Sequence, residues 1–188
     1  MILVIGDSFT AGEELADAFN DSWPSWLEID SSQLIINLSQ PGFSNDAIIR
    51  TATNAIEDHH GLIDTVIIAW TTPHRIELNA QHLTPTSHRK YGSICDTVFL
   101  DWQEDWAIDK FRSQVLMMKG FLKSRKIKYL FVRTFDVPEL GIGGWVPGSM
   151  VEWMGDCPKG PGGHPLELGH QRIAERINEH IRNLGWVS

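Results

Sequence analysis

The chain alternates between short apolar runs and amphipathic segments, and this alternation limits the folds open to it. Runs of β-branched and aliphatic residues predict buried strands at residues 2–5, 34–38, 65–70 and 128–132. Helical periodicity predicts helices at residues 12–19, 45–57, 106–122 and 167–183. Strands that alternate with helices form a parallel sheet covered on both faces, with right-handed crossovers. The sequence therefore predicts a three-layer α/β/α sandwich, in which only residues 143–153 could supply a short fifth strand.

Size and composition fit a single domain over residues 1–188. With 188 residues, 42% of them hydrophobic, the chain can bury a full core but has little room for a second independent unit. Its formal net charge of −8 argues against a nucleic-acid-binding surface. Cys95 and Cys157 could form a disulfide, but we expect two reduced thiols, and no Cys/His grouping has zinc-ligand spacing.

The first predicted strand leads directly into a serine. Gly6 interrupts the apolar run where the backbone must turn, and Ser8 follows at the carboxyl end of the strand. Ligands of open α/β sheets bind at that edge, so a hydroxyl group there is a candidate nucleophile. An alternative is that Asp7, Ser8 and Thr10 only cap the helix that follows.

A histidine near the other end of the chain is a candidate partner for Ser8. His164 lies in a Gly/Pro-rich loop immediately before the last amphipathic helix, whereas His170 is expected to pack within the first turns of that helix. A neutral imidazole has a pKa of about 6.5 and suits general-base chemistry near neutral pH. The two ends of the chain together therefore carry the parts of a serine-based site.

These segments resemble the SGNH hydrolases, also called GDSL esterases or lipases. The sequence Gly6-Asp7-Ser8 matches the first block of that family, and His164 followed by Gly-His at 169–170 matches the last. The resemblance implies a flavodoxin-like order of parallel strands, with Ser8 as nucleophile and His164 as general base. A middle match at residues 37–46 implies that the backbone N–H groups of Ser8 and Gly42 stabilise the oxyanion.

The chain departs from the family pattern at two catalytic positions. Three residues before His164, where the family has an Asp that orients the imidazole, this chain has Pro161, and the candidate replacements are Asp156 and a backbone carbonyl. The family's Gly-x-Asn-Asp block is replaced by Trp-Thr-Thr-Pro-His-Arg at 70–75, where Thr72, or less favourably Thr71, offers a hydroxyl in place of the Asn amide. The resemblance therefore implies a slow or specialised enzyme.

Two long segments are expected to form the walls of the substrate site. Residues 74–102 read as an insertion leaving the third strand, and residues 137–163 read as an active-site loop leading to His164. Candidate substrate-binding residues at this edge are Asp7, Trp70, Arg75 and Trp145. Arg75 could bind a carboxylate or phosphate, or else form an ion pair within the insertion. The histidines of the insertion show no metal-ligand pattern, so we expect neither metal nor cofactor; they are His74, His82 and His88.

The leading functional hypothesis is a serine esterase that removes acyl groups, such as acetyl, from a carbohydrate or small ester through an acyl-enzyme on Ser8. The 70–75 stretch also looks like SGNH-type proteins of tailed phages, which favours a glycan-related substrate. One alternative is an SGNH-fold binding or structural module with impaired catalysis, and another is a flavodoxin-like phosphate or flavin carrier. Acyl chain, hydrolase or acyltransferase activity and oligomeric state stay open.

No signal peptide or membrane-spanning stretch is expected from the sequence. The first predicted core strand begins at the second residue, without a basic leader. No apolar stretch approaches the length of a membrane span. We therefore expect a cytoplasmic protein without membrane or nucleic-acid partners, in the host cytoplasm or the virion if a phage encodes it.

Overall fold

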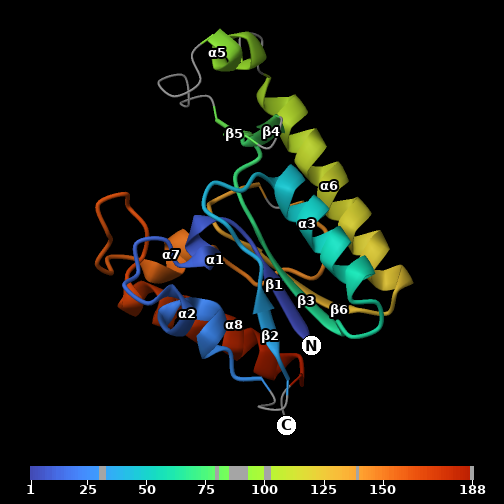
Figure 1. Ribbon diagram of the computed structural model, residues 1–188, viewed down its shortest axis with the longest axis vertical. Coiled ribbons are helices and arrows are strands. Elements are labelled where there is room, and N and C mark those ends of the chain that lie inside the picture. The colour runs from blue at the N-terminus through green and yellow to red at the C-terminus, as the bar shows by residue number, and fades with distance from the viewer. Residues whose placement is uncertain (30–32, 79–80, 85–92, 100–102, 139, 187–188) are drawn as a thin grey trace.

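The centre of the protein is a parallel sheet with the strand order β2-β1-β3-β6 (Figure 1). The computed structural model describes residues 1–29, 33–78, 81–84, 93–99, 103–138 and 140–186. The strands are β1 (Ile2–Ile5), β2 (Ile35–Asn37), β3 (Thr65–Trp70) and β6 (Lys128–Arg133). All three pairings are parallel, with Leu3 of β1 aligned with Ile36 on one side and Val66 on the other. The predicted flavodoxin-like parallel sheet is confirmed.

Helices cover both faces of the sheet, because alternate strand residues enter two separate cores. Leu3 and Ile68 pack with α3 (Asn45–Asp58) and α6 (Glu104–Ser124) on one face. Ile2 and Ile67 pack on the other face with the 3-10 helix η1 (Trp23–Trp26), α7 (Met150–Met154) and α8 (Glu167–Asn183). The structure therefore confirms the three-layer α/β/α sandwich (Figure 1). Among the described helices, none combines the length and apolar character that a membrane span requires.

The helix predicted at residues 12–19 is wrong, and a turn takes its place. Helix α1 (Ser8–Ala11) ends at Gly12, whose φ of 78° is the left-handed conformation that favours glycine. Helix α2 (Ala18–Asp21) begins only after Asp17, whose carboxylate accepts from the Asn20 N–H at 3.1 Å. The intervening turn holds two consecutive glutamates, Glu13 and Glu14, at the end of α1.

The predicted insertion contains a small antiparallel hairpin of β4 (Ile76–Leu78) and β5 (Gln81–Leu83), followed by α5 (Ser93–Phe99). In Figure 1 these elements lie beyond one end of the sheet, next to the ends of α3 and α6. Arg50 of α3 forms an ion pair with Glu77 at 2.5 Å, which fastens β4 to the main domain. Residues 79–80, 85–92 and 100–102 of the insertion, His88 included, lie outside the described residues.

The stretch expected to supply a short fifth strand makes a single parallel bridge to β6. Trp145 pairs with Phe131, whose N–H donates to Gly144 O at 2.7 Å and whose carbonyl accepts from Val146 N at 2.9 Å. This bridge anchors the long loop that leads to α7.

Burial of His170 predicts a pH-dependent stability. Its side chain is fully buried, accepts the Trp23 N–H at 3.2 Å and has its pKa lowered by burial to about 4. An unfolded histidine titrates near 6.5, so the unfolded chain binds the proton more tightly and acid favours unfolding. We expect this group alone to lower the free energy of unfolding by about 3 kcal/mol between pH 6.5 and pH 4.

Urea unfolding at several pH values measures this effect. His170→Gln should flatten the pH dependence across that window, whereas His60→Gln, at an exposed histidine, should leave it unchanged. An equally steep dependence in His170→Gln and in the original chain would contradict the assignment.

Candidate active site

Ser8 lies at the carboxyl edge of the sheet, as the first residue of α1. The tight connection from β1 depends on Gly6, because a Cβ there would lie 2.4 Å from Thr10 Oγ1 and 2.8 Å from Ala69 Cβ. Asp7 caps the helix, with its Oδ1 accepting from the Phe9 N–H at 3.2 Å. The Ser8 hydroxyl has no hydrogen-bond partner among the described residues and is therefore not used as a cap.

Asp7 is a buried structural carboxylate that joins the ends of β1 and β3. Its Oδ2 accepts the Thr71 hydroxyl at 2.6 Å and lies 3.4 Å from a guanidinium nitrogen of Arg75. Burial raises the pKa of Asp7 above its ordinary value, although Thr71 and then Arg75 act in the opposite direction. Because Asp7 is 0% exposed, it has no surface to offer a substrate, which corrects its predicted role in substrate binding.

Glu14 is the carboxylate that contacts the Nδ1 atom of His164. Its Oε2 lies 2.9 Å from Nδ1 and also accepts the His164 backbone N–H at 3.1 Å, while its Oε1 accepts the Gly162 N–H at 2.6 Å. The Gly162 hydrogen bond is the largest cause that holds the pKa of Glu14 below its ordinary value, and the His164 side chain adds to it. An ionised Glu14 thus fixes both the loop and the imidazole.

The close approach of Glu14 depends on glycine in the facing loop. A Cβ at Gly160 would lie 2.6 Å from Glu14 Oε2 and 2.9 Å from Glu14 Cβ. Glu14 itself adopts a φ of 71°, which is uncommon for a residue other than glycine and is often found at functional sites. Small residues on one segment and an unusual backbone conformation on the other therefore permit this contact.

Asp156, a predicted orienting residue, does not contact His164, and Glu14 occupies that position instead. Asp156 is exposed and makes no hydrogen bond or ion pair with His164 among the described residues. Two features of the sequence could have indicated Glu14 as the partner of His164. A pair of glutamates follows shortly after Ser8, at the same sheet edge, and Pro161 stands at the position where the family has its acid.

The other ring nitrogen of His164 faces a second carboxylate. Nε2 lies 3.2 Å from Glu13 Oε2, and no hydrogen bond joins Ser8 and His164 in the described part of the chain. The imidazole nevertheless lies against the segment that carries Ser8, since the rings of His164 and Phe9 are 5.6 Å apart in an edge-on arrangement. Catalytic hydrogen bonds are often long or poorly aligned before substrate binds, so this geometry is compatible with a resting site.

The predicted oxyanion donors differ in what they already bind. Gly42 has a φ of 82°, and the structure gives neither its N–H nor that of Ser8 an acceptor among the described residues. The Thr72 hydroxyl accepts the His74 N–H at 3.4 Å, and the Thr71 hydroxyl donates to Asp7. The Thr71 hydroxyl is thus occupied by its hydrogen bond to Asp7. The N–H groups of Ser8 and Gly42, by contrast, are available to a ligand.

Arg75 connects the Gly42 loop to Asp7. Its guanidinium donates to Phe43 O at 2.9 Å and forms the ion pair with Asp7, while its side chain is only 15% exposed. Arg75 therefore does form an ion pair, as considered from the sequence, but its partner is Asp7 instead of a residue of the insertion.

The two tryptophans proposed to bind substrate have different surroundings. Trp70 is 0% exposed and packs edge-on against Phe111 and Phe131, at 5.7 and 5.6 Å between ring centroids. A side chain enclosed in this way belongs to the core, which corrects its predicted place in the substrate site. Trp145 is partly buried and packs against Phe131 at 5.4 Å.

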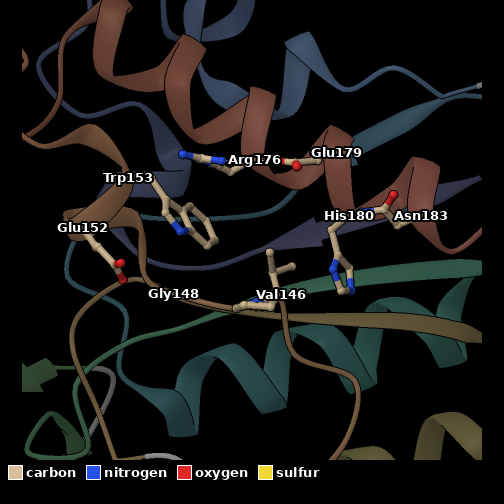
Figure 2. Close-up of a pocket in the computed structure, with 9 residues that line it drawn as sticks. Val146, Gly148, Glu152, Trp153, Arg176, Glu179, His180 and Asn183 are labelled. Carbon is tan, nitrogen blue, oxygen red and sulfur yellow. Dashed lines mark hydrogen bonds and ion pairs between the residues drawn. The ribbon is translucent and has the colours of Figure 1, made fainter.

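The predicted active-site loop divides into two parts. Its last part contains Gly160 and Gly162, which lie against Glu14. Its middle part forms a separate cavity of about 360 Å³ against α8, shown in Figure 2, where Trp153 and Val146 face Arg176 and His180. Neither Ser8 nor His164 is among the residues that line this cavity, so it is distinct from the candidate active site. The described residues contain no group of three or more metal-ligating side chains.

Comparison with solved structures identifies the fold. The chain matches the protein TesA with a TM-score of 0.62 at 14% identity, over 97% of this chain and 98% of that one. It matches the psychrotrophic esterase EstA from a Pseudoalteromonas species, inhibited by monoethylphosphonate, with a TM-score of 0.63 at 13% identity, over 97% of each chain. A putative lipolytic G-D-S-L protein from Desulfitobacterium hafniense DCB-2 matches with a TM-score of 0.57 at 14% identity, over 95% of this chain and 97% of that one.

The chain therefore has the fold of the SGNH, or GDSL, hydrolases, and the resemblance seen in its sequence motifs is confirmed at the level of structure. No family model and no curated protein matches the sequence.

The close contact between Glu14 and the loop predicts that adding one methyl group at Gly160 will displace the Glu14 side chain and destabilise the protein. Gly160→Ala should displace Glu14 and cost about 1–3 kcal/mol of stability, because the new Cβ meets the Glu14 side chain well inside van der Waals distance. Gly143→Ala is the control, since a Cβ there meets nothing nearer than Lys119 Nζ at 3.9 Å. Nitrogen-15 NMR of His164 measures the hydrogen bond directly. An unchanged Nδ1 signal in Gly160→Ala would contradict the proposed dependence.

Proposed function

We propose that this protein is a serine esterase of the SGNH type, with Ser8, His164 and Glu14 as its catalytic triad. The observation that carries the proposal is the 2.9 Å contact between Glu14 Oε2 and His164 Nδ1, beside the segment that presents Ser8 at the sheet edge. The arrangement of nucleophile, base and orienting carboxylate is the one that acyl transfer requires. The lipolytic names of the structural neighbours agree with it.

In the proposed acylation step, Nε2 of His164 takes the proton of the Ser8 hydroxyl as Oγ bonds to the ester carbonyl carbon. The carbonyl oxygen becomes an oxyanion, which the Ser8 and Gly42 N–H groups stabilise. The bond from the carbonyl carbon to the alcohol oxygen then breaks, and that oxygen leaves with the proton from Nε2. The products of this step are the free alcohol and an acyl group on Ser8.

Deacylation repeats the same steps with water as the nucleophile. His164 removes a proton from water, the new oxyanion occupies the same donors, and Ser8 recovers its proton as the carboxylic acid leaves. Glu14 remains ionised throughout and stabilises the imidazolium that forms in each half-reaction. We infer a modest turnover, because the Thr72 hydroxyl stands where the family has an amide, and loss of one oxyanion-hole donor costs about 100-fold to 1,000-fold.

The surrounding polar residues hold the two N–H donors in place. Asn45 donates to Thr71 O at 3.1 Å and accepts the Thr71 N–H at 3.0 Å, so the start of α3 is tied to the end of β3. Arg75 continues this connection to Phe43, the neighbour of Gly42. A purely binding or structural role would give no reason for an ionised carboxylate at Nδ1 of His164.

For the substrate, we propose a short acyl ester of a carbohydrate or another small alcohol.

Hydrolysis of p-nitrophenyl acetate, together with labelling by an ethyl fluorophosphonate, tests the proposal. Ser8→Ala and His164→Ala should lower kcat by about 1,000-fold or more, and Ser8→Ala should abolish labelling. Glu14→Gln should lower kcat by about 100-fold to 10,000-fold, because an uncharged amide cannot stabilise the imidazolium.

The matched control is Asp156→Asn, which removes a carboxylate from the exposed position that the sequence suggested. We expect it to retain the original kcat. Retained activity in Ser8→Ala, or loss of activity in Asp156→Asn but not in Glu14→Gln, would overturn the assignment.

A further inference from the structure

Consecutive glutamates contact the opposite nitrogens of one imidazole, but they are bound very differently. The Glu14 carboxylate accepts from Gly162 and from two nitrogens of His164, so its hydrogen-bonding capacity is largely used. Glu13 has a side chain that is 40% exposed, and its one ion-pair partner among the described residues is His164 Nε2 at 3.2 Å. Within the described part of the chain, the Glu13 carboxylate is therefore held only by Nε2 of His164, the proposed general-base atom.

Proton transfer requires that this contact be broken. In the proposed function, on which this inference rests, Nε2 first receives the Ser8 proton and then delivers it to the alcohol oxygen of the ester. Each transfer needs a heavy-atom distance of about 2.6–3.2 Å between Nε2 and the oxygen. Glu13 occupies one such place around Nε2 in the free protein, and so it competes with Ser8 and the leaving group for that nitrogen.

The alcohol part of the substrate must then lie close to Glu13. The leaving oxygen comes within hydrogen-bond distance of Nε2, and Glu13 Oε2 is 3.2 Å from the same atom. No lysine or arginine pairs with Glu13 among the described residues. Once its contact with Nε2 is broken, the Glu13 carboxylate is thus available to a group on the alcohol.

We propose that Glu13 determines specificity for the alcohol part of the ester, selecting alcohols that carry a cationic or hydrogen-bond-donating group and rejecting anionic ones. Such a substrate gives Glu13 a new partner and frees Nε2 for Ser8. An apolar alcohol offers no replacement, and the contact with His164 persists as an inhibitory interaction. Glu13 thereby links recognition of the leaving group to the release of the general base.

A pair of esters that differ in charge alone tests this role. Acetylcholine and its carbon isostere 3,3-dimethylbutyl acetate have the same acyl group and nearly the same shape. We expect Glu13→Gln to lower the ratio of their kcat/KM values, acetylcholine over isostere, by about threefold, the size expected for a partly exposed ion pair. The kcat/KM for the neutral isostere should rise in the same variant, because Nε2 is no longer held.

The control is Asp21→Asn, which removes the same charge from the neighbouring helix α2 at a residue that makes no hydrogen bond or ion pair with His164. It should leave the ratio unchanged. An unchanged ratio in Glu13→Gln, or an equal fall in both variants, would overturn the role of Glu13. Failure of Ser8 to react with fluorophosphonate in the original chain would instead overturn the proposed esterase function, so the two failures are distinguishable.

Discussion

The buried carboxylate of Asp7 is the interaction on which the arrangement of the candidate site depends. It caps α1 through Phe9, accepts the hydroxyl of Thr71 at the end of β3, and pairs with Arg75, which in turn holds the carbonyl of Phe43. A carboxylate removed from water is costly unless it is paired and hydrogen-bonded, so these partners are needed together. One side chain thus fixes the position of Ser8 relative to β3 and to the Gly42 loop.

Much of the fold could be predicted from the sequence, because buried parallel strands leave a strong local signal. The apolar run at 65–70 and the amphipathic segment at 167–183 have the bounds that β3 and α8 adopt. The failure at residues 12–19 has a local cause as well. Periodicity favoured a helix there, but Gly12 in a left-handed conformation and the Asp17 cap divide the segment into a turn and two short helices.

The candidate site was less predictable, because its decisive contact joins residues that are far apart in the sequence. The motif blocks point to Ser8, His164 and Gly42 by position, yet nothing local indicates that Glu14 faces Gly162 and His164 across the edge of the sheet. Trp70 illustrates the opposite limit. Its neighbours in the sequence place it at the end of a strand, but only the packing of Phe111 and Phe131 shows that its side chain is enclosed.

The position of Glu14 also has a consequence for how the site forms during folding. Ser8 and Glu14 belong to one short segment of the chain, whereas His164 comes from a distant part of the sequence. Because 150 residues separate Glu14 from His164, their contact closes a long loop of the chain. We expect this contact to need the sheet and α8 in place. We therefore expect the contact between Glu14 and His164 to form late in folding, when α8 packs against the sheet. Until then, Ser8 and Glu14 would lie on one segment without the imidazole beside them.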